Sequence, residues 1–141
     1  MTNREMKSKV MSLGNRLSKT MDRRDAFVQA WIIVKRGAVE FPVKGVMAGN
    51  RQEALRRLAN YAPDQVRAFL MPEPENKFDS NAIAVMVMVQ GGPGVYKIGY
   101  IPASETAKAA AVRGNASIRV VCGTWGHTGN HTFGGRVALT V

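Results

Sequence analysis

The strongest constraint on the fold lies between residues 82 and 102, in the segment AIAVMVMVQGGPGVYKIGYIP. Its first eight residues are apolar without alternating polar side chains, which indicates a strand that is covered on both faces. The following GGPG has the composition of a turn, and YKIGYIP supplies a second strand that ends at Pro102. The segment therefore predicts a β-hairpin whose first strand is central in a sheet.

Four further strands are predicted around this hairpin. Val39, Phe41 and Val43 alternate along the chain as in a strand with one buried face. Residues 66–71 form a short apolar strand, and the segments ASIRVVCGTW and GRVALTV indicate two more strands that flank a glycine-rich loop, GHTGNHTFGG. Strands interrupted by helices predict an α+β fold or a small closed barrel rather than a doubly wound sheet.

Two short helices are predicted between these strands. NRQEALRRLANYAP has Asn50 as a candidate N-cap with an acid three residues on, and it would bury Leu55, Leu58 and Ala59. The alanine-rich SETAKAAAVR predicts a second helix that ends at Gly114. Both helices are short enough to cover the ends of a small sheet structure.

Residues 1–37 form a basic segment of a different character. Residues 3–19 are polar and weakly periodic, which fits either a helix or a loosely held tail. From Asp22 the sequence DRRDAFVQAWIIVKRG predicts a capped helix that Gly37 ends, and its core-facing stripe would contain Phe27, Trp31 and Val34. We expect a helical extension over residues 1–37 and one globular domain over residues 38–141.

The charge of the chain points to polyanionic partners. Its formal net charge is +10, and residues 1–36 contain nine of the twenty basic residues but three of the ten acidic ones. The longest apolar run is far shorter than the ~20 residues of a membrane span, and the start of the chain does not resemble a secretory signal. We therefore expect a cytoplasmic protein with no membrane partner.

Catalytic and metal-binding patterns are weak in this sequence. His127, His131 and Cys122 could be drawn as a zinc site, but the spacing of a structural zinc motif and a fourth ligand are missing. Glu73 and Glu75 are paired carboxylates without the third acid and the lysine typical of a metal-dependent nuclease. We expect a binding protein rather than an enzyme, with no metal and no cofactor.

The stretch PEPENKFDSNAIAV, followed by GYIP and an alanine-rich helix, resembles the signature of the HIRAN domain family. The upstream VKGVMAGNRQEAL is similar to the first strand of the family and its Arg-Gln helix start. The resemblance extends over residues ~39 to 141. The signature residues are, in chain order, Glu73, Pro74, Asn76, Phe78, Asp79, Asn81, Ala82, Ile83, Val85, Gly99 and Tyr100.

This resemblance implies a fold and a function. The fold is a small OB-like or SH3-like β-barrel of about six strands with two short helices, here preceded by the helical extension. The function is binding of single-stranded DNA at a free 3′ end, and the chain would be a stand-alone bacterial or phage member of the family. It would act in DNA repair, replication or the biology of a mobile element.

The resemblance also implies a binding pocket. An aromatic ring can stack on any base, and a carboxylate can accept a hydrogen bond from a terminal hydroxyl while repelling a phosphate. Phe78 stands where tyrosine is common in the family, so the hydrogen bond of a phenol is absent. The pocket would contain Phe78, Asp79, Asn76 and Tyr100, surrounded by the phosphate-binding cations Lys44, Arg51 and Lys97.

Another class of function stays open from the sequence alone. The same barrel, or the helix over residues 22–36, could bind a partner protein such as a helicase or nuclease. A compact basic protein of this kind could regulate a nucleic-acid enzyme, for example as a phage inhibitor.

Overall fold

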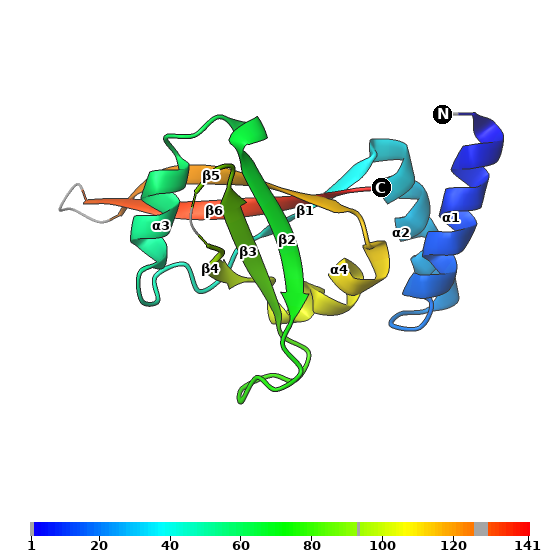
Figure 1. Cartoon of the computed structure of the whole chain (residues 1–141). Coiled ribbons are helices and arrows are strands. Elements are labelled where there is room, and N and C mark those ends of the chain that lie inside the picture. Colours follow the sequence, from blue (N-terminus) through cyan, green and yellow to red (C-terminus); the bar gives the residue numbers. More distant parts are fainter. Residues whose placement is uncertain (1, 93, 126–129) are drawn as a thin grey trace.

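Six strands form two three-stranded antiparallel sheets (Figure 1). The computed structural model describes residues 2–92, 94–125 and 130–141, with the backbone alone for 122–125 and 130–131. The first sheet has the order β1-β6-β5, with β1 at Ala38–Pro42, β5 at Asn115–Trp125 and β6 at Asn130–Thr140. The second has the order β2-β3-β4, with β2 at Val66–Pro72, β3 at Ile83–Val89 and β4 at Tyr96–Tyr100. The predicted number of strands is confirmed.

The predicted hairpin is the pair β3 and β4, and β3 is the central strand of its sheet, as expected. The register shifts between Val85 and Met86, because Val85 pairs with Gly99 and Met86 with Lys97. Ile98 lies at this bulge and is fully buried. A bulge bends and twists its strand, and here it lies next to Tyr100, the last residue of β4.

The prediction of a glycine-rich loop over residues 126–135 is wrong for residues 130–135. These residues belong to β6, which pairs with β5 from Asn115 opposite Thr140 as far as Trp125 opposite Asn130. The pairing of two long strands outweighs the low strand propensity of glycine. Gly135 also serves the next strand, because its carbonyl accepts a hydrogen bond of 2.9 Å from the amide of Val43.

Within the described residues, a backbone bridge joins the two sheets on one side. Lys44 and Tyr100 exchange two backbone hydrogen bonds of 2.8 Å each. Gly99 makes this approach possible, since a Cβ atom there would lie 2.3 Å from the carbonyl oxygen of Lys44. On the opposite side β2 and β5 lie side by side. The described strands do not pair there, so the expected closed barrel is not found, and a groove of about 460 Å³ follows this seam.

Helix α3 (Arg51–Leu58) packs on β4 and β6 at one end of the sheets. Leu55 and Leu58 are buried as predicted, whereas Ala59 is exposed because the helix has already ended. Asn50 precedes the helix without a side-chain cap, and Glu53 instead forms ion pairs with the arginines of the last turn. A 3-10 turn at Pro63–Gln65 then leads into β2.

Helix α4 (Thr106–Val112) follows a 3-10 turn at Ala103–Glu105. Its left-handed C-cap is Arg113, with φ of 55°, and not Gly114 as predicted. Gly114 is required for a different reason, because a Cβ atom there would lie 2.4 Å from the carbonyl oxygen of Thr140. The glycine therefore permits a close approach of two backbones.

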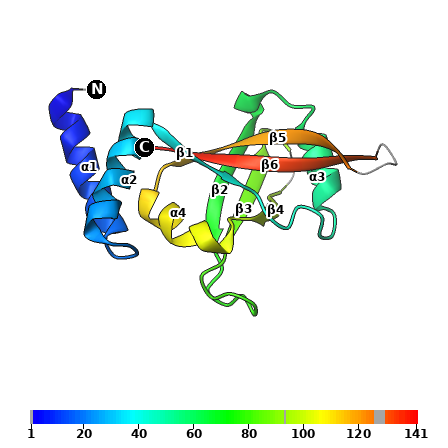
Figure 2. The same ribbon diagram turned by 180° about the vertical axis from the view of Figure 1, so that it is seen from behind.

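Residues 3–19 are mostly helical, so this segment is a helix and not the loosely held tail that the sequence also allowed. Helices α1 (Asn3–Leu17) and α2 (Arg23–Arg36) pack on each other, and α1 also packs on α4. Arg16 reinforces the second contact, since its Nε donates to the carbonyl of Ala111 at 2.6 Å. The pair lies at the end of the molecule opposite α3 (Figures 1 and 2). No described helix is long and apolar enough to cross a membrane.

The ends of α2 are as predicted, and its predicted buried face is confirmed for Val34 and for the partly buried Phe27 but wrong for Trp31. Asp22 caps the start and Gly37, with φ of 82°, ends the helix. The core face contains Ala26, Ala30, Ile33 and Val34, while Trp31 is 44% exposed. Phe27 packs against α1, where Gly14 leaves room for its ring.

The core lies between the two sheets and extends under the helices. The carbonyl of Gly37 accepts a hydrogen bond of 3.0 Å from the amide of Val141, so the start of β1 lies against the last residue. The largest fully buried side chains are Phe41, Leu13, Leu17, Leu55, Ile98, Leu139, Val34, Val85, Val87 and Val137.

Candidate functional site

The loop of residues 73–82, between β2 and β3, is held by two amino-acid side chains of the signature. The Oδ1 of Asn76 accepts hydrogen bonds from the amides of Phe78 at 2.9 Å and Asp79 at 3.1 Å. The Oδ1 of Asp79 accepts a hydrogen bond from the amide of Asn81 at 2.8 Å. Asn and Asp commonly make such turns. Both residues therefore shape the loop that presents Phe78.

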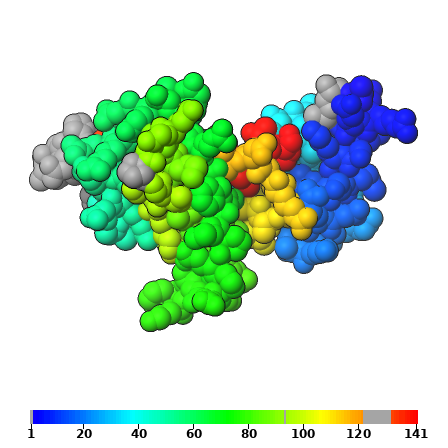
Figure 3. All heavy atoms as spheres, in the orientation of Figure 1, coloured from blue at the N-terminus to red at the C-terminus, as the bar shows by residue number. Residues whose placement is uncertain are grey.

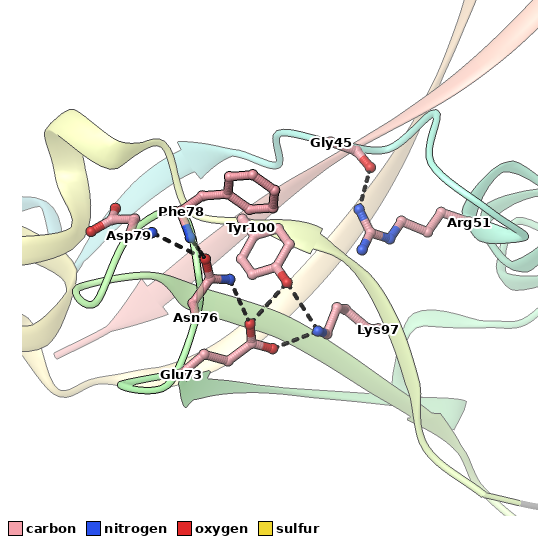
Figure 4. A network of polar contacts seen from close by, with 8 residues as sticks. All are labelled: Gly45, Arg51, Glu73, Asn76, Phe78, Asp79, Lys97 and Tyr100. Atoms are coloured by element: carbon pink, nitrogen blue, oxygen red, sulfur yellow. Dashed lines mark hydrogen bonds and ion pairs between the residues drawn. The ribbon is translucent and has the colours of Figure 1, made fainter.

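Phe78 lies at the exposed surface of this loop, with 97% of its surface accessible. A large apolar ring in this position gains nothing from burial within the chain. In Figure 4 the ring of Phe78 lies on the same side of Asn76 as Tyr100, whereas the carboxylate of Asp79 lies on the opposite side. The side chains of Phe78 and Asp79 thus point to different sides of the loop.

Glu73 joins the loop to β4. Its Oε1 accepts hydrogen bonds from the Tyr100 hydroxyl at 2.9 Å and from the Asn76 amide at 3.1 Å. Its Oε2 forms an ion pair with Lys97. These donors, Lys97 foremost, stabilise the carboxylate and lower the pKa of Glu73 to about 2. Four side chains from β4 and the loop thus form one polar network, drawn in Figure 4.

The ring of Tyr100 lies close to two cations. The Arg51 guanidinium is 5.4 Å and the Lys97 ammonium 5.1 Å from the ring centroid, both in cation–π range. Arg51, in the first turn of α3, is fixed by donation from Nη1 to the carbonyl of Gly45 at 2.7 Å. Gly45 adopts φ of 74°, a left-handed conformation suited to glycine. The turn after β1 thus positions Arg51 beside Tyr100.

The three predicted cations differ in how much charge they offer. Lys97 is neutralised in part by Glu73, and contact with that carboxylate and Tyr100 raises the pKa of Lys97. Arg51 and Lys44 form no ion pair among the described residues. The backbone of Lys44 pairs with Tyr100, and its side chain is exposed. A phosphate would therefore meet uncompensated charge at Lys44 and Arg51.

Sequence reasoning missed two residues of this site. Glu73 was weighed only as a metal ligand, although its place in the signature, beside Asn76, was a signal for the network. Gln52 binds the carbonyls of Val46 at 3.0 Å and Phe133 at 2.7 Å, and accepts a hydrogen bond of 2.8 Å from the Phe133 amide. It thus anchors α3 to β6 and supports Arg51, the adjacent residue.

The zinc alternative involves side chains outside the described residues, namely those of Cys122, His127 and His131. Among the side chains that are described, no three His, Cys, Asp or Glu residues are grouped as metal ligands. The expected absence of a metal stays a prediction.

Residues 37–141 match the family model described as HIRAN domain. The chain belongs to the HIRAN domain family. HIRAN domains are nucleic-acid-binding modules, and binding rather than catalysis is their role. No curated protein and no solved structure matches the chain.

The HIRAN match begins at Gly37, the C-cap of α2, so it leaves α1 and α2 outside. Within the match, the signature residues divide into two groups. Gly99, Ile83 and Val85 build the sheet and its junction. Glu73, Asn76 and the residues of their network form the polar site at the end of that sheet.

Proposed function

We propose that this HIRAN protein binds single-stranded DNA at a free 3′ end through the surface around Phe78 and Tyr100. The observation that carries the proposal is the almost complete exposure of Phe78 on a loop that Asn76 holds in shape. Stacking of a base on an aromatic side chain contributes about 1–3 kcal/mol and does not depend on the base. Phe78 is a ready stacking platform because its loop is already formed.

The charges around Tyr100 support a nucleic-acid ligand. Arg51 and Lys97 flank the ring, and Lys44 follows on the adjacent bridge. Lysine and arginine side chains that neutralise phosphates supply the salt-dependent part of nucleic-acid affinity. In this proposal Lys44 and Arg51 bind the DNA backbone, and the basic segment of residues 1–37 adds affinity without sequence preference.

Specificity for the 3′ end is assigned to Asp79. Its Oδ1 accepts the turn hydrogen bond from Asn81, and its Oδ2 accepts none among the described residues. A terminal hydroxyl can donate to this oxygen, whereas a terminal phosphate would meet like charge. The end of the strand would thus lie beyond Asn76, on the side of the loop where Figure 4 places the carboxylate.

Fluorescence anisotropy with labelled oligonucleotides tests the proposal. Matched single-stranded and duplex DNAs, ending in 3′-OH or 3′-phosphate, would be titrated at two salt concentrations. Tight binding that requires a single-stranded 3′-OH is expected. Equal affinity for the two ends would refute end recognition. Complete loss of binding at the higher salt would show that the protein binds DNA only through the charge of its basic surface.

A second candidate function is docking of a partner protein on α2. Val28, Trp31 and Ile32 are 51%, 44% and 39% exposed, and their spacing places them on one helix face. Aromatic residues exposed in this way are frequent at protein interfaces. Capture of proteins from a nuclease-treated lysate by the wild type, and their loss with Trp31→Ala, is the expected result of this alternative.

A further inference from the structure

No described helix covers the outward face of the sheet β2-β3-β4, of which β2 and β3 lie in front in Figure 3. Strand residues alternate between the two faces, and the buried Val85 and Val87 mark the inward one. Phe69, Met71 and Met88 are 38%, 40% and 36% exposed. The outward apolar residues, here called the methionine face, are Phe69, Met71, Met86 and Met88.

The methionine face is continuous with the polar network around Tyr100. The strand register places Met71, Ala84 and Tyr100 in one row across the sheet. The next row contains Phe69, Met86 and Lys97. The Glu73–Tyr100 hydrogen bond crosses β3 at Ala84, which is fully buried although it points outward. The network therefore covers the first row, and the exposed apolar surface begins at its edge.

One edge of this face has a cation that forms no ion pair among the described residues, and the other edge has an ion pair. Arg67 lies beyond Phe69 on β2, as the register partner of Met88, and it is exposed. Lys97 is at the opposite edge on β4. The outward residues of the three strands include no acid, and the adjoining Glu73 is already paired with Lys97. An apolar strip beside the exposed Arg67 suits a ligand with flat apolar groups on a polyanionic backbone.

We infer that the methionine face binds the nucleotides that precede the 3′ end of the DNA. This inference rests on the proposed function and extends it from the terminal nucleotide to a path across the sheet. Phe69 stacks on one base, the polarisable thioethers of Met86 and Met88 pack on its neighbours, and Arg67 binds a phosphate.

The length of the path follows from the sheet geometry. Phe69 and Lys97 are separated by two interstrand spacings, about 10 Å. Stacked nucleotides follow one another at about 3.4 Å along a strand, and extended ones lie further apart. The base on Phe69 therefore lies about two to three stacked nucleotides from one beside Lys97, on the 5′ side of the terminal nucleotide at Phe78.

An abasic scan of the DNA tests this placement. The probe is a ten-nucleotide oligothymidylate with a free 3′-OH and a 5′ fluorescein, in which one base at a time is removed. Anisotropy titrations compare the full-length wild type with Phe69→Ala, Phe69→Tyr and the control Val121→Ala. Val121 has a similar exposure, 40%, but lies on β5 in the other sheet. Thermal melting of each variant verifies the fold.

The wild type is expected to lose about 5- to 160-fold in affinity when the internal base that stacks on Phe69 is removed, and less when the other internal bases are removed. Phe69→Ala should bind the intact probe more weakly by a similar factor and lose its sensitivity to that removal. Phe69→Tyr and Val121→Ala should behave like the wild type.

Two results would overturn the inference. One is unchanged affinity of Phe69→Ala for the intact probe; the other is a loss that is equal for every abasic position. A Phe78→Ala variant separates this failure from that of the proposed function. If Phe78→Ala weakens binding and Phe69→Ala does not, the proposed recognition of the 3′ end is supported and the proposed path across the methionine face is wrong. If 3′-phosphate and Phe78→Ala have no effect but Phe69→Ala does, the path stands without end recognition.

Discussion

Replacing Glu73 with glutamine removes the charge at the centre of the network and keeps the shape of the side chain. The partners of Glu73 lower its pKa from 4.5 to about 2, and each pKa unit corresponds to about 1.36 kcal/mol. The full pKa shift would correspond to ~3 kcal/mol in the free energy of unfolding. Because the side chains of Lys97 and Glu73 are 31% and 18% exposed, water screens part of it, and we expect a loss of ~2 kcal/mol at pH 7.

The pH dependence of this loss distinguishes charge from packing. A carboxyl group whose pKa is lowered on folding stabilises the protein fully above its unfolded pKa, and the contribution disappears as the pH falls through the folded value. For Glu73 the window runs from pH 4.5 down to about 2. The difference between wild type and Glu73→Gln should therefore shrink to ~0.5 kcal/mol at pH 2.5.

Urea unfolding followed by circular dichroism measures both values. Glu53→Gln is the matched control, because Glu53 is also paired with arginine but lies on the exposed surface of α3. It should change the free energy of unfolding far less than Glu73→Gln does. An equal loss for Glu73→Gln at pH 7 and pH 2.5 would show that the charge of Glu73 does not stabilise the site.

Three further predictions concern single side chains. Phe78→Ala should weaken binding of 3′-OH DNA by about 5- to 100-fold in anisotropy titrations while leaving the melting temperature unchanged, because the ring is 97% exposed. Gly99→Ala should lower the free energy of unfolding by ~3 kcal/mol or more in urea titrations, because its Cβ would overlap the carbonyl of Lys44; a neutral result would disprove the close approach. Lys44→Ala should reduce the slope of log affinity against log salt by about one, whereas an unchanged slope would place the phosphates elsewhere.

The sequence predicted the parts of the fold that depend on local pattern. The apolar run of β3 and the turn residues behind it specified the hairpin, and Asp22 and Gly37 marked the ends of α2. The buried face of α2 was predicted only in part because apolar residues surround the helix. Periodicity placed Trp31 beside Phe27 and Val34, whereas the structure buries Ala26 and Ala30 and leaves Trp31 44% exposed.

The candidate site was harder to predict because its contacts join distant residues. Glu73 meets Lys97 and Tyr100 across β3, and Arg51 reaches Tyr100 from another element. The spacing of residues along the sequence does not indicate such contacts between distant residues. The resemblance to HIRAN domains predicted that Tyr100 and Asn76 lie on one surface. The role of Glu73 as their common hydrogen-bond acceptor could be recognised only from the register of the sheet.

The hydrogen bond between Val141 and Gly37 joins the two boundaries of the HIRAN match. Both boundaries lie next to α1 and α2, at the end of the molecule away from α3 (Figure 2). A domain of this layout can be attached to, or inserted into, another polypeptide through one small patch of its surface. Attachment of another polypeptide at this patch requires no change in the arrangement of Glu73, Lys97 and Tyr100. The same module can therefore be combined with different neighbouring domains.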